Sequence, residues 1–133
     1  MKRVTLDSNV WLSALFWQGE ASRIVELAEK KKIVLYSSKE ILLEIAKVLE
    51  RETKFRSSSE SIREVIDKIA DLSNDTVIKT RTGIVHEDPD DNKIIDCAIN
   101  SKSEFLITYD KHLLKLRNYK KIKIVHPTKF LKF

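Results

Sequence analysis

The chain has 133 residues, of which 42% are hydrophobic, and it carries 25 lysine and arginine residues against 20 acids. This length and hydrophobic content predict one domain over residues 1–133, and no apolar run approaches the roughly 18 residues that cross a membrane. The single cysteine excludes an internal disulfide framework and a multi-thiolate zinc site. Together with a start that lacks the apolar core of a signal peptide, it predicts a cytoplasmic protein.

The charge is distributed unevenly along the chain. Residues 111–133 contain eight basic residues and no acid, whereas residues 1–110 contain 17 basic and 20 acidic residues. An acidic body with a basic segment can attract a polyanion to one place and keep carboxylates at another. A solvated, lysine-rich face explains the same pattern without any ligand.

The first third of the chain predicts a strand, two helices and a second strand. Residues 3–7 form a short apolar run that ends in an acid, as a buried strand does. Apolar residues recur at helical spacing over residues 8–17 and 21–31, and the β-branched run at residues 33–36 predicts the next strand.

The middle of the chain predicts two helices. Each begins with a capping box, at residues 37–40 and 57–60, in which a serine and a glutamate three residues later satisfy the first backbone N–H groups. The apolar faces of these helices follow at residues 41–49 and 62–72. On the first helix Glu44 lies about 40° beyond the edge of the apolar stripe, at 100° per residue.

The second half of the chain alternates in the same way. Strands are predicted at residues 76–79, 105–108 and 122–125. An acidic turn at residues 87–91 precedes a helix, a short helix is expected around residues 113–116, and a turn at residues 127–131 ends the chain. Strands that alternate with helices predict an α/β fold with a central, mostly parallel sheet and helices on both faces.

The acidic residues fall where such a sheet carries its functional site. Ligands bind beyond the carboxyl ends of parallel strands, and Asp7 and Asp110 each follow a predicted strand. Glu44 belongs to the helix that leaves the same edge after residues 33–36. Asp91 and Asp96 lie at the start of the helix before residues 105–108. We therefore expect these carboxylates to approach one another.

Such a cluster of acids requires a cation. Two unit charges about 4 Å apart repel by roughly 4 kcal/mol at an effective dielectric near 20, a large part of the stability of a small domain. Carboxylate oxygens without histidine or cysteine suit a hard ion, Mg²⁺ or Mn²⁺. Such an ion lowers the pKa of a bound water and bridges a phosphate, which points to hydrolysis of phosphodiester bonds.

These residues resemble the PIN domain nucleases, and within that family the bacterial and archaeal branch of VapC-like toxins. Five pieces in order carry the resemblance: residues 4–10, the helix that holds Glu44, residues 88–98, residues 106–114 and residues 127–131. The likeness implies a three-layer α/β/α fold and a metal-dependent endonuclease acting on single-stranded RNA. It also implies a toxin–antitoxin pair with a small antitoxin protein and, by analogy, a homodimer.

The resemblance assigns the acids of the family residue by residue. The first, second and fourth acids match Asp7, Glu44 and Asp110, and Thr108 matches a hydroxyl residue beside the last of them. The position of the third acid holds Asn92 instead.

Asp96 is the preferred substitute for the third acid, with Asp91 second, because a similar sub-branch has an asparagine and an acid at the two corresponding positions. The catalytic set is thus Asp7, Glu44, Asp96 and Asp110, and Asp91 joins them as a candidate metal ligand. Six further residues are candidates for contact with the substrate or the metal shell: Ser8, Asn9, Asn92, Lys93, Thr108 and Lys111.

Each of these residues also has a purely structural interpretation. Asp7 and Asp110 suit the caps of the helices that follow them, as do Ser8 and Asn9, and Glu44 could be an ordinary surface glutamate. Only the expected convergence of the acids on one edge favours a site over these roles.

Other polar or reactive residues favour structural roles. The histidines, His86, His112 and His126, lack ligand spacing, and Cys97 is expected to be a core thiol. Trp11 and Trp17 have the spacing of core residues rather than of a base-stacking pair. A calcium loop beginning at residue 88 is excluded, because lysine and isoleucine occupy the positions that need glycine and glutamate.

Three alternatives to a toxin nuclease remain. The asparagine at the third acidic position favours a PIN domain that binds RNA but has lost hydrolysis. A PIN nuclease outside toxin–antitoxin systems, acting in RNA maturation or turnover, uses the same residues. An aspartate at a strand end also suits a phosphoaspartate enzyme or receiver, although a dehalogenase-like phosphatase needs a second aspartate where Asn9 stands.

Overall fold

A six-stranded sheet forms the centre of the computed structural model, which describes residues 1–52, 58–82 and 89–133. The strands are β1 (Lys2–Leu6), β2 (Ile33–Ser37), β3 (Asn74–Asp75), β4 (Phe105–Ile107), β5 (Asn118–Tyr119) and β6 (Ile122–Val125). Their order is β3-β2-β1-β4-β6-β5, and all neighbours are parallel except β5 and β6. The expected mostly parallel sheet is confirmed.

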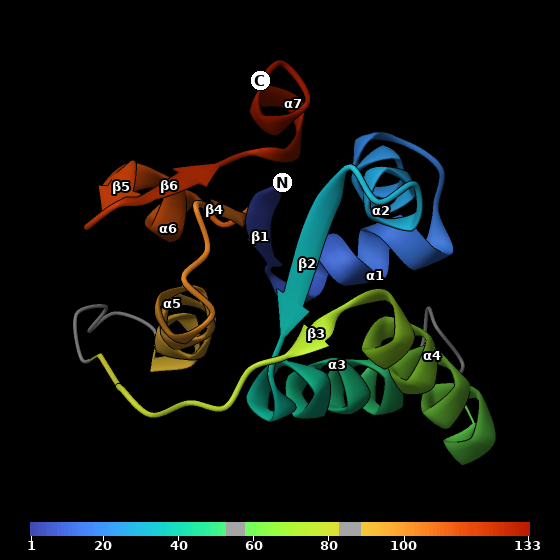
Figure 1. Cartoon of the computed structure of the whole chain (residues 1–133). Coiled ribbons are helices and arrows are strands. Elements are labelled where there is room, and N and C mark those ends of the chain that lie inside the picture. Colours follow the sequence, from blue (N-terminus) through green and yellow to red (C-terminus); the bar gives the residue numbers. More distant parts are fainter. Residues whose placement is uncertain (53–57, 83–88) are drawn as a thin grey trace.

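Helices cover both faces of this sheet (Figure 1). They are α1 (Ser8–Phe16), α2 (Glu20–Glu29), α3 (Lys39–Arg51), α4 (Ser59–Leu72), α5 (Pro89–Asn100), α6 (Lys111–Leu116) and α7 (Pro127–Phe130). The first two lie on one side of β1 and β2, and α5 packs across β1, β2 and β4 from the other side. This arrangement is the three-layer α/β/α fold. None of the helices described is long and apolar enough to cross a membrane.

The two middle helices begin at serine caps, as expected, but one residue later than predicted. The Ser38 hydroxyl accepts from the Ile41 N–H at 3.3 Å, and the Ser58 hydroxyl accepts from the Ser61 N–H at 3.1 Å. Ser37 instead ends β2, and its hydroxyl lies 2.8 Å from that of Ser73. The strand therefore extends one residue further and displaces the cap.

The strand predicted at residues 76–79 is wrong. The pairing with β2 lies at Asn74–Asp75, and residues 76–79 form no strand. The side chain of Asn100 accepts the N–H groups of Lys79 and Thr80 at 2.9 and 3.0 Å. A side chain thus satisfies donors that a neighbouring strand would otherwise bind. The short antiparallel β5 was not predicted.

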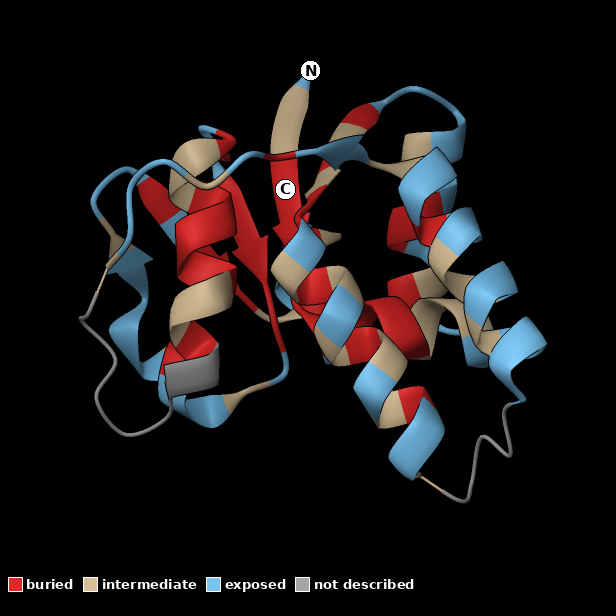
Figure 2. Cartoon of the chain, turned by 90° about the horizontal axis from the view of Figure 1, so that it is seen from below, coloured by how far each residue is buried: buried red, intermediate tan, exposed pale blue. Residues whose placement is uncertain are grey.

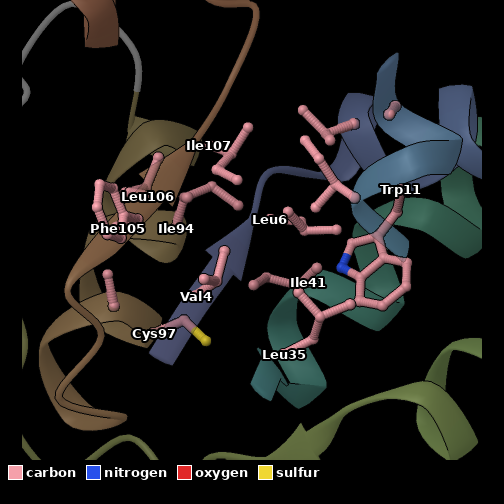
Figure 3. Packing of buried hydrophobic residues seen from close by; sticks show 14 of the residues in the cluster. Val4, Leu6, Trp11, Leu35, Ile41, Ile94, Cys97, Phe105, Leu106 and Ile107 are labelled. Carbon is pink, nitrogen blue, oxygen red and sulfur yellow. The ribbon is translucent and has the colours of Figure 1, made fainter. Parts of the chain in front are cut away.

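Buried side chains from β1 join the two helical layers into one core. Figure 3 shows Val4 and Leu6 with Ile94 and Cys97 of α5 on one side, and with Leu35, Ile41 and Trp11 on the other. The expected core positions of Trp11 and Cys97 are confirmed, since both are fully buried. Trp17 is 54% exposed, so its predicted core role is wrong. The outward faces of α3 and α4 are exposed, as Figure 2 shows.

The carboxyl ends of β1 and β4 meet at the middle of the sheet. Leu6 pairs with Ile107, and the Asp7 N–H donates to the Ile107 carbonyl at 2.9 Å. The chain passes from β1 to β2 on one side, whereas β4 lies on the other side. Connections that diverge in this way leave a crevice beyond the strand ends, where α/β proteins bind their ligands.

Candidate active site

Asp7 lies at the point where β1 ends and α1 begins. The residue is 9% exposed, and its carboxylate accepts hydrogen bonds from the Ser8 N–H and the Thr108 hydroxyl, both at 2.7 Å. Burial raises the pKa of Asp7 to about 6, and the charges of Glu44 and Asp110 add to the shift, while the two hydrogen bonds oppose it. Asp7 therefore both caps α1 and presents a carboxylate that is hard to ionise.

Asp110 is tied to Asp7 through one hydroxyl. Thr108 is fully buried, and its oxygen accepts from the Asp110 N–H at 3.0 Å while its hydrogen is donated to Asp7. The Asp110 carboxylate accepts from the His112 N–H at 2.7 Å and so caps α6. The capping role predicted as an alternative is present, and it fixes the direction of the carboxylate.

Glu44 reaches the same place from α3. Its Oε2 accepts from the Ser8 hydroxyl at 2.8 Å, and Ser8 follows Asp7 directly. Ser8 thus contacts two acids, one through its backbone N–H and one through its side chain. Three carboxylates separated by up to 103 positions in the sequence are in this way connected by Ser8 and Thr108.

These acids line a cavity of about 520 Å³, here called the acid cavity. Its acidic residues are Asp7, Glu44, Glu52, Asp91 and Asp110. The remaining lining residues are Ser8, Asn9, Leu12, Ser13, Trp17, Val48, Arg51 and Tyr109. The cavity is predominantly acidic, and Arg51 is the one cationic residue among the described residues that line it.

The two candidates for the third acid lie in different surroundings. Asp91 is 6% exposed and lines the acid cavity, whereas Asp96 does not line it. Asp96 accepts the Thr82 N–H at 2.7 Å and lies 3.9 Å from Arg81. Burial raises the pKa of Asp96, and the contacts with Thr82 and Arg81 oppose that shift. Asp96 is thus engaged in holding the segment before α5.

The predicted contact residues divide into two groups. Ser8 and Asn9 line the acid cavity, and Thr108 lies beneath it in contact with Asp7. The other three, Asn92, Lys93 and Lys111, do not line it.

The residues expected to be structural occupy ordinary positions. The His126 ring accepts the Thr128 N–H at 3.1 Å and caps α7. Burial raises the pKa of the Cys97 thiol to about 11, as suits an unreactive core cysteine. His86 and Asp88, the first residue of the calcium loop that the sequence excludes, lie outside the described residues.

Sequence reasoning missed seven residues that line the cavity: Leu12, Ser13, Trp17, Val48, Arg51, Glu52 and Tyr109. The positions of Arg51 and Glu52 carry a usable signal, because they follow Glu44 by seven and eight residues and so return to its side of the helix. Tyr109 directly precedes Asp110. Trp17 gave the opposite signal, since its spacing suggested the core.

The cavity supplies oxygen ligands but no ready-made coordination shell. Among the side chains described, no group of three histidine, cysteine, aspartate or glutamate residues is close enough to form a metal site as it stands. Asp7 and Glu44 are each held by internal hydrogen bonds. Mg²⁺ tolerates such spacing, because it usually keeps several waters and takes only one or two carboxylates directly.

The family follows from the sequence over this same region. Residues 3–112 match the PIN domain model. The chain belongs to the PIN domain family. PIN domains are nucleases, and the acid cavity of this PIN domain lies within the matched residues.

A solved structure has the same fold as this PIN domain. It is the crystal structure of VapBC2 from Rickettsia felis bound to a DNA fragment from their promoter. The TM-score is 0.66 at 14% identity, over 93% of this chain and 98% of the matched chain. No curated protein sequence matches significantly. The family match replaces the phosphoaspartate alternative.

Proposed function

We propose that this PIN domain is a Mg²⁺- or Mn²⁺-dependent endoribonuclease that hydrolyses phosphodiester bonds of single-stranded RNA. One observation carries the proposal. Asp7, Glu44, Asp91 and Asp110 come from four separate parts of the chain, and all four line one cavity at the carboxyl edge of the sheet. Acids gathered at such cost to stability are typical of a metal-dependent hydrolytic site.

The donor set fits a hard divalent cation. All four candidate ligands are carboxylates, and Ser8, Asn9 and Ser13 add neutral oxygen donors around them. A bound ion would neutralise these acids and polarise a phosphodiester and a water, which is the chemistry that hydrolysis needs. Asp7, Glu44, Asp91 and Asp110 are proposed to hold it, with Asp96 in a supporting role.

The surrounding residues position the acids and the substrate. Thr108 and Ser8 fix the Asp7 carboxylate by two 2.7 Å hydrogen bonds, so its oxygens do not have to be reordered when the substrate arrives. The basic segment at residues 111–133 begins beside Asp110 and offers lysines to the RNA backbone. Lys111 and Lys115, on α6 directly after Asp110, are the lysines of this segment that follow the acid most closely, whereas Lys123 pairs with Phe105 at the start of β4, at the other edge of the sheet.

The proposal includes a biological context. The fold shared with a chain of the VapBC2 complex supports a toxin of a toxin–antitoxin pair, with a small antitoxin protein as partner. A homodimer is proposed by analogy with the family alone. A neighbouring open reading frame that encodes a short DNA-binding protein would favour this context over RNA maturation or turnover. Co-purification of the two products as one complex tests it directly.

A cleavage assay tests the activity. Purified protein with Mn²⁺ should cut a labelled single-stranded RNA, and chelation of the metal or the substitution Asp7→Asn should abolish cutting. A contaminating nuclease would survive Asp7→Asn, so the variant is the decisive control. A duplex of the same sequence measures the preference for single strands.

Asn92 favours the second candidate, an RNA-binding PIN domain without hydrolysis. This asparagine stands at the family's third acidic position. Under this alternative the protein binds single-stranded RNA with Mn²⁺ present, leaves it intact, and binds equally well after Asp7→Asn. That combination of results would replace the nuclease proposal.

A further inference from the structure

We infer that Trp17 is a stacking platform for an unpaired nucleobase of the RNA strand that enters the acid cavity. The inference rests on the proposed ribonuclease function and adds to it a binding subsite for one base beside the acids. Trp17 belongs neither to the acid set nor to the residues that position it.

Trp17 forms a wall shared by two cavities. It lines the acid cavity together with Asp7 and Asp110. It also lines a second cavity of about 520 Å³ over the connection between α1 and α2, here called the α1–α2 cavity. A strand that runs from the acids toward the α1–α2 cavity would pass the Trp17 indole.

The exposure of Trp17 is a consequence of where α1 ends. The helix stops at Phe16, and Trp17 adopts an extended conformation with φ −135° and ψ 160° while its N–H still donates to the Ser13 carbonyl at 3.1 Å. The backbone of this residue is thus fixed. Trp11, six residues earlier, points about 120° away around the helix and is fully buried, whereas Trp17 is 54% exposed.

The surroundings of the indole suit a nucleotide. The α1–α2 cavity contains the polar side chains of Gln18, Arg23 and Glu26, which can bind base edges or a phosphate. Arg51 lines the acid cavity, so one guanidinium lies in each of the two cavities that Trp17 separates. Single-stranded nucleic acid is commonly bound by this combination of an aromatic face and nearby cations.

Binding measurements without cleavage isolate this role. In the Asp7→Asn background, fluorescence anisotropy of a short labelled single-stranded RNA should show that Trp17→Ala weakens binding by roughly 5- to 150-fold, the usual range for loss of one base stack. Trp17→Phe keeps an aromatic face and should lose much less. Leu43→Ala is the matched control, because Leu43 is also 54% exposed and lines neither cavity.

An abasic scan identifies the stacked base. A set of oligonucleotides is made in which each lacks the base at one position. One of them should bind the wild-type protein as weakly as the Trp17→Ala variant binds the intact strand. Combining that abasic site with Trp17→Ala should cause no further loss, because both changes remove the same contact. Additive losses at every position would overturn the inference.

Intrinsic fluorescence gives a readout that a merely structural role would not move. Single-stranded RNA should quench the emission of exposed Trp17, and Trp17→Phe should remove the quenching while buried Trp11 continues to emit. If the RNA is bound and cleaved but neither the affinity nor the fluorescence depends on Trp17, the stacking inference fails alone. If the protein neither binds nor cleaves RNA, the proposed function fails. If Trp17→Ala abolishes the binding of a protein partner and leaves the RNA affinity unchanged, the surface around Trp17 binds that partner instead.

Discussion

The hydroxyl of Thr108 donates to the carboxylate of Asp7 at 2.7 Å, across 101 residues of sequence and from the neighbouring strand end. The same oxygen accepts the N–H of Asp110 at 3.0 Å. One buried side chain thus sets the positions of two acids at once. The geometry of the candidate site depends on the register between β1 and β4, which makes the site a property of the fold rather than of any loop.

Thr108→Val should separate this positioning role from simple packing. Valine keeps the shape but leaves the Asp110 N–H without its acceptor and Asp7 without a donor, so the free energy of unfolding should fall by about 1–3 kcal/mol. Activity should fall by roughly 10- to 100-fold, as for other residues that support metal ligands. Urea unfolding and RNA cleavage measure the two effects. Thr80→Val, at an exposed residue held through its backbone by Asn100, should change neither.

The raised pKa of Asp7 predicts that the metal-free protein loses stability as the pH rises. The folded pKa is about 6 and the ordinary value is 3.8, so between these values the folded state keeps a proton that the unfolded state has released. The proton on Asp7 therefore contributes roughly 3 kcal/mol to the free energy of unfolding below pH 4, and this contribution is lost by about pH 6.

Asp7→Asn removes this titration and tests it. In a chelator, the variant should be more stable than the wild type at pH 7 and should lose the decline between pH 4 and 6, as measured by thermal unfolding at several pH values. Asp67→Asn, on the exposed face of α4, controls for the loss of one negative charge. A variant less stable than the wild type at pH 7 would contradict a crowded, desolvated carboxylate.

Most of the fold could be predicted because hydrophobic periodicity reports burial directly. The stripe on α3 and the apolar runs of β1 and β4 leave few alternatives once parallel pairing is assumed. The strand at residues 76–79 failed because β-branched Val77 and Ile78 suggested pairing that the fold does not offer. Val77 is 69% exposed, and the following N–H groups bind Asn100.

The site was predictable to the extent that topology fixes it. Strand ends of a parallel sheet meet at one edge, so Asp7 and Asp110 could be brought together without coordinates. Asp96 was ranked above Asp91 on the family resemblance alone, because residues five apart point about 140° from each other and only the packing of α5 decides which faces the cavity. Trp17 was misplaced because periodicity does not reveal that the helix ends one residue earlier.

Divalent ions should stabilise the protein through the same acids. Mg²⁺ or Mn²⁺ at 100 times its dissociation constant should add about 2.7 kcal/mol to the free energy of unfolding of the wild type. Asp7→Asn should gain much less. Because a ligand carboxylate must be ionised, the stabilisation should also weaken as the pH falls through about 6. Equal stabilisation of wild type and variant, seen by calorimetry, would place the ion elsewhere.

The positions of Asp91 and Asp96 predict opposite consequences for the two substitutions to asparagine. Asp91→Asn removes a carboxylate from the acid cavity, so it should abolish most of the Mn²⁺-induced stabilisation and lower kcat/KM by more than roughly 100-fold, beyond the usual loss at a supporting residue. Asp96→Asn keeps an oxygen that can accept the Thr82 N–H, so the response to Mn²⁺ should persist. Asp96→Ala loses that hydrogen bond and should cost about 1–3 kcal/mol of stability without losing the response. The reverse pattern, with Mn²⁺ stabilisation kept in Asp91→Asn and lost in Asp96→Asn, would restore Asp96 as the third acid of the site.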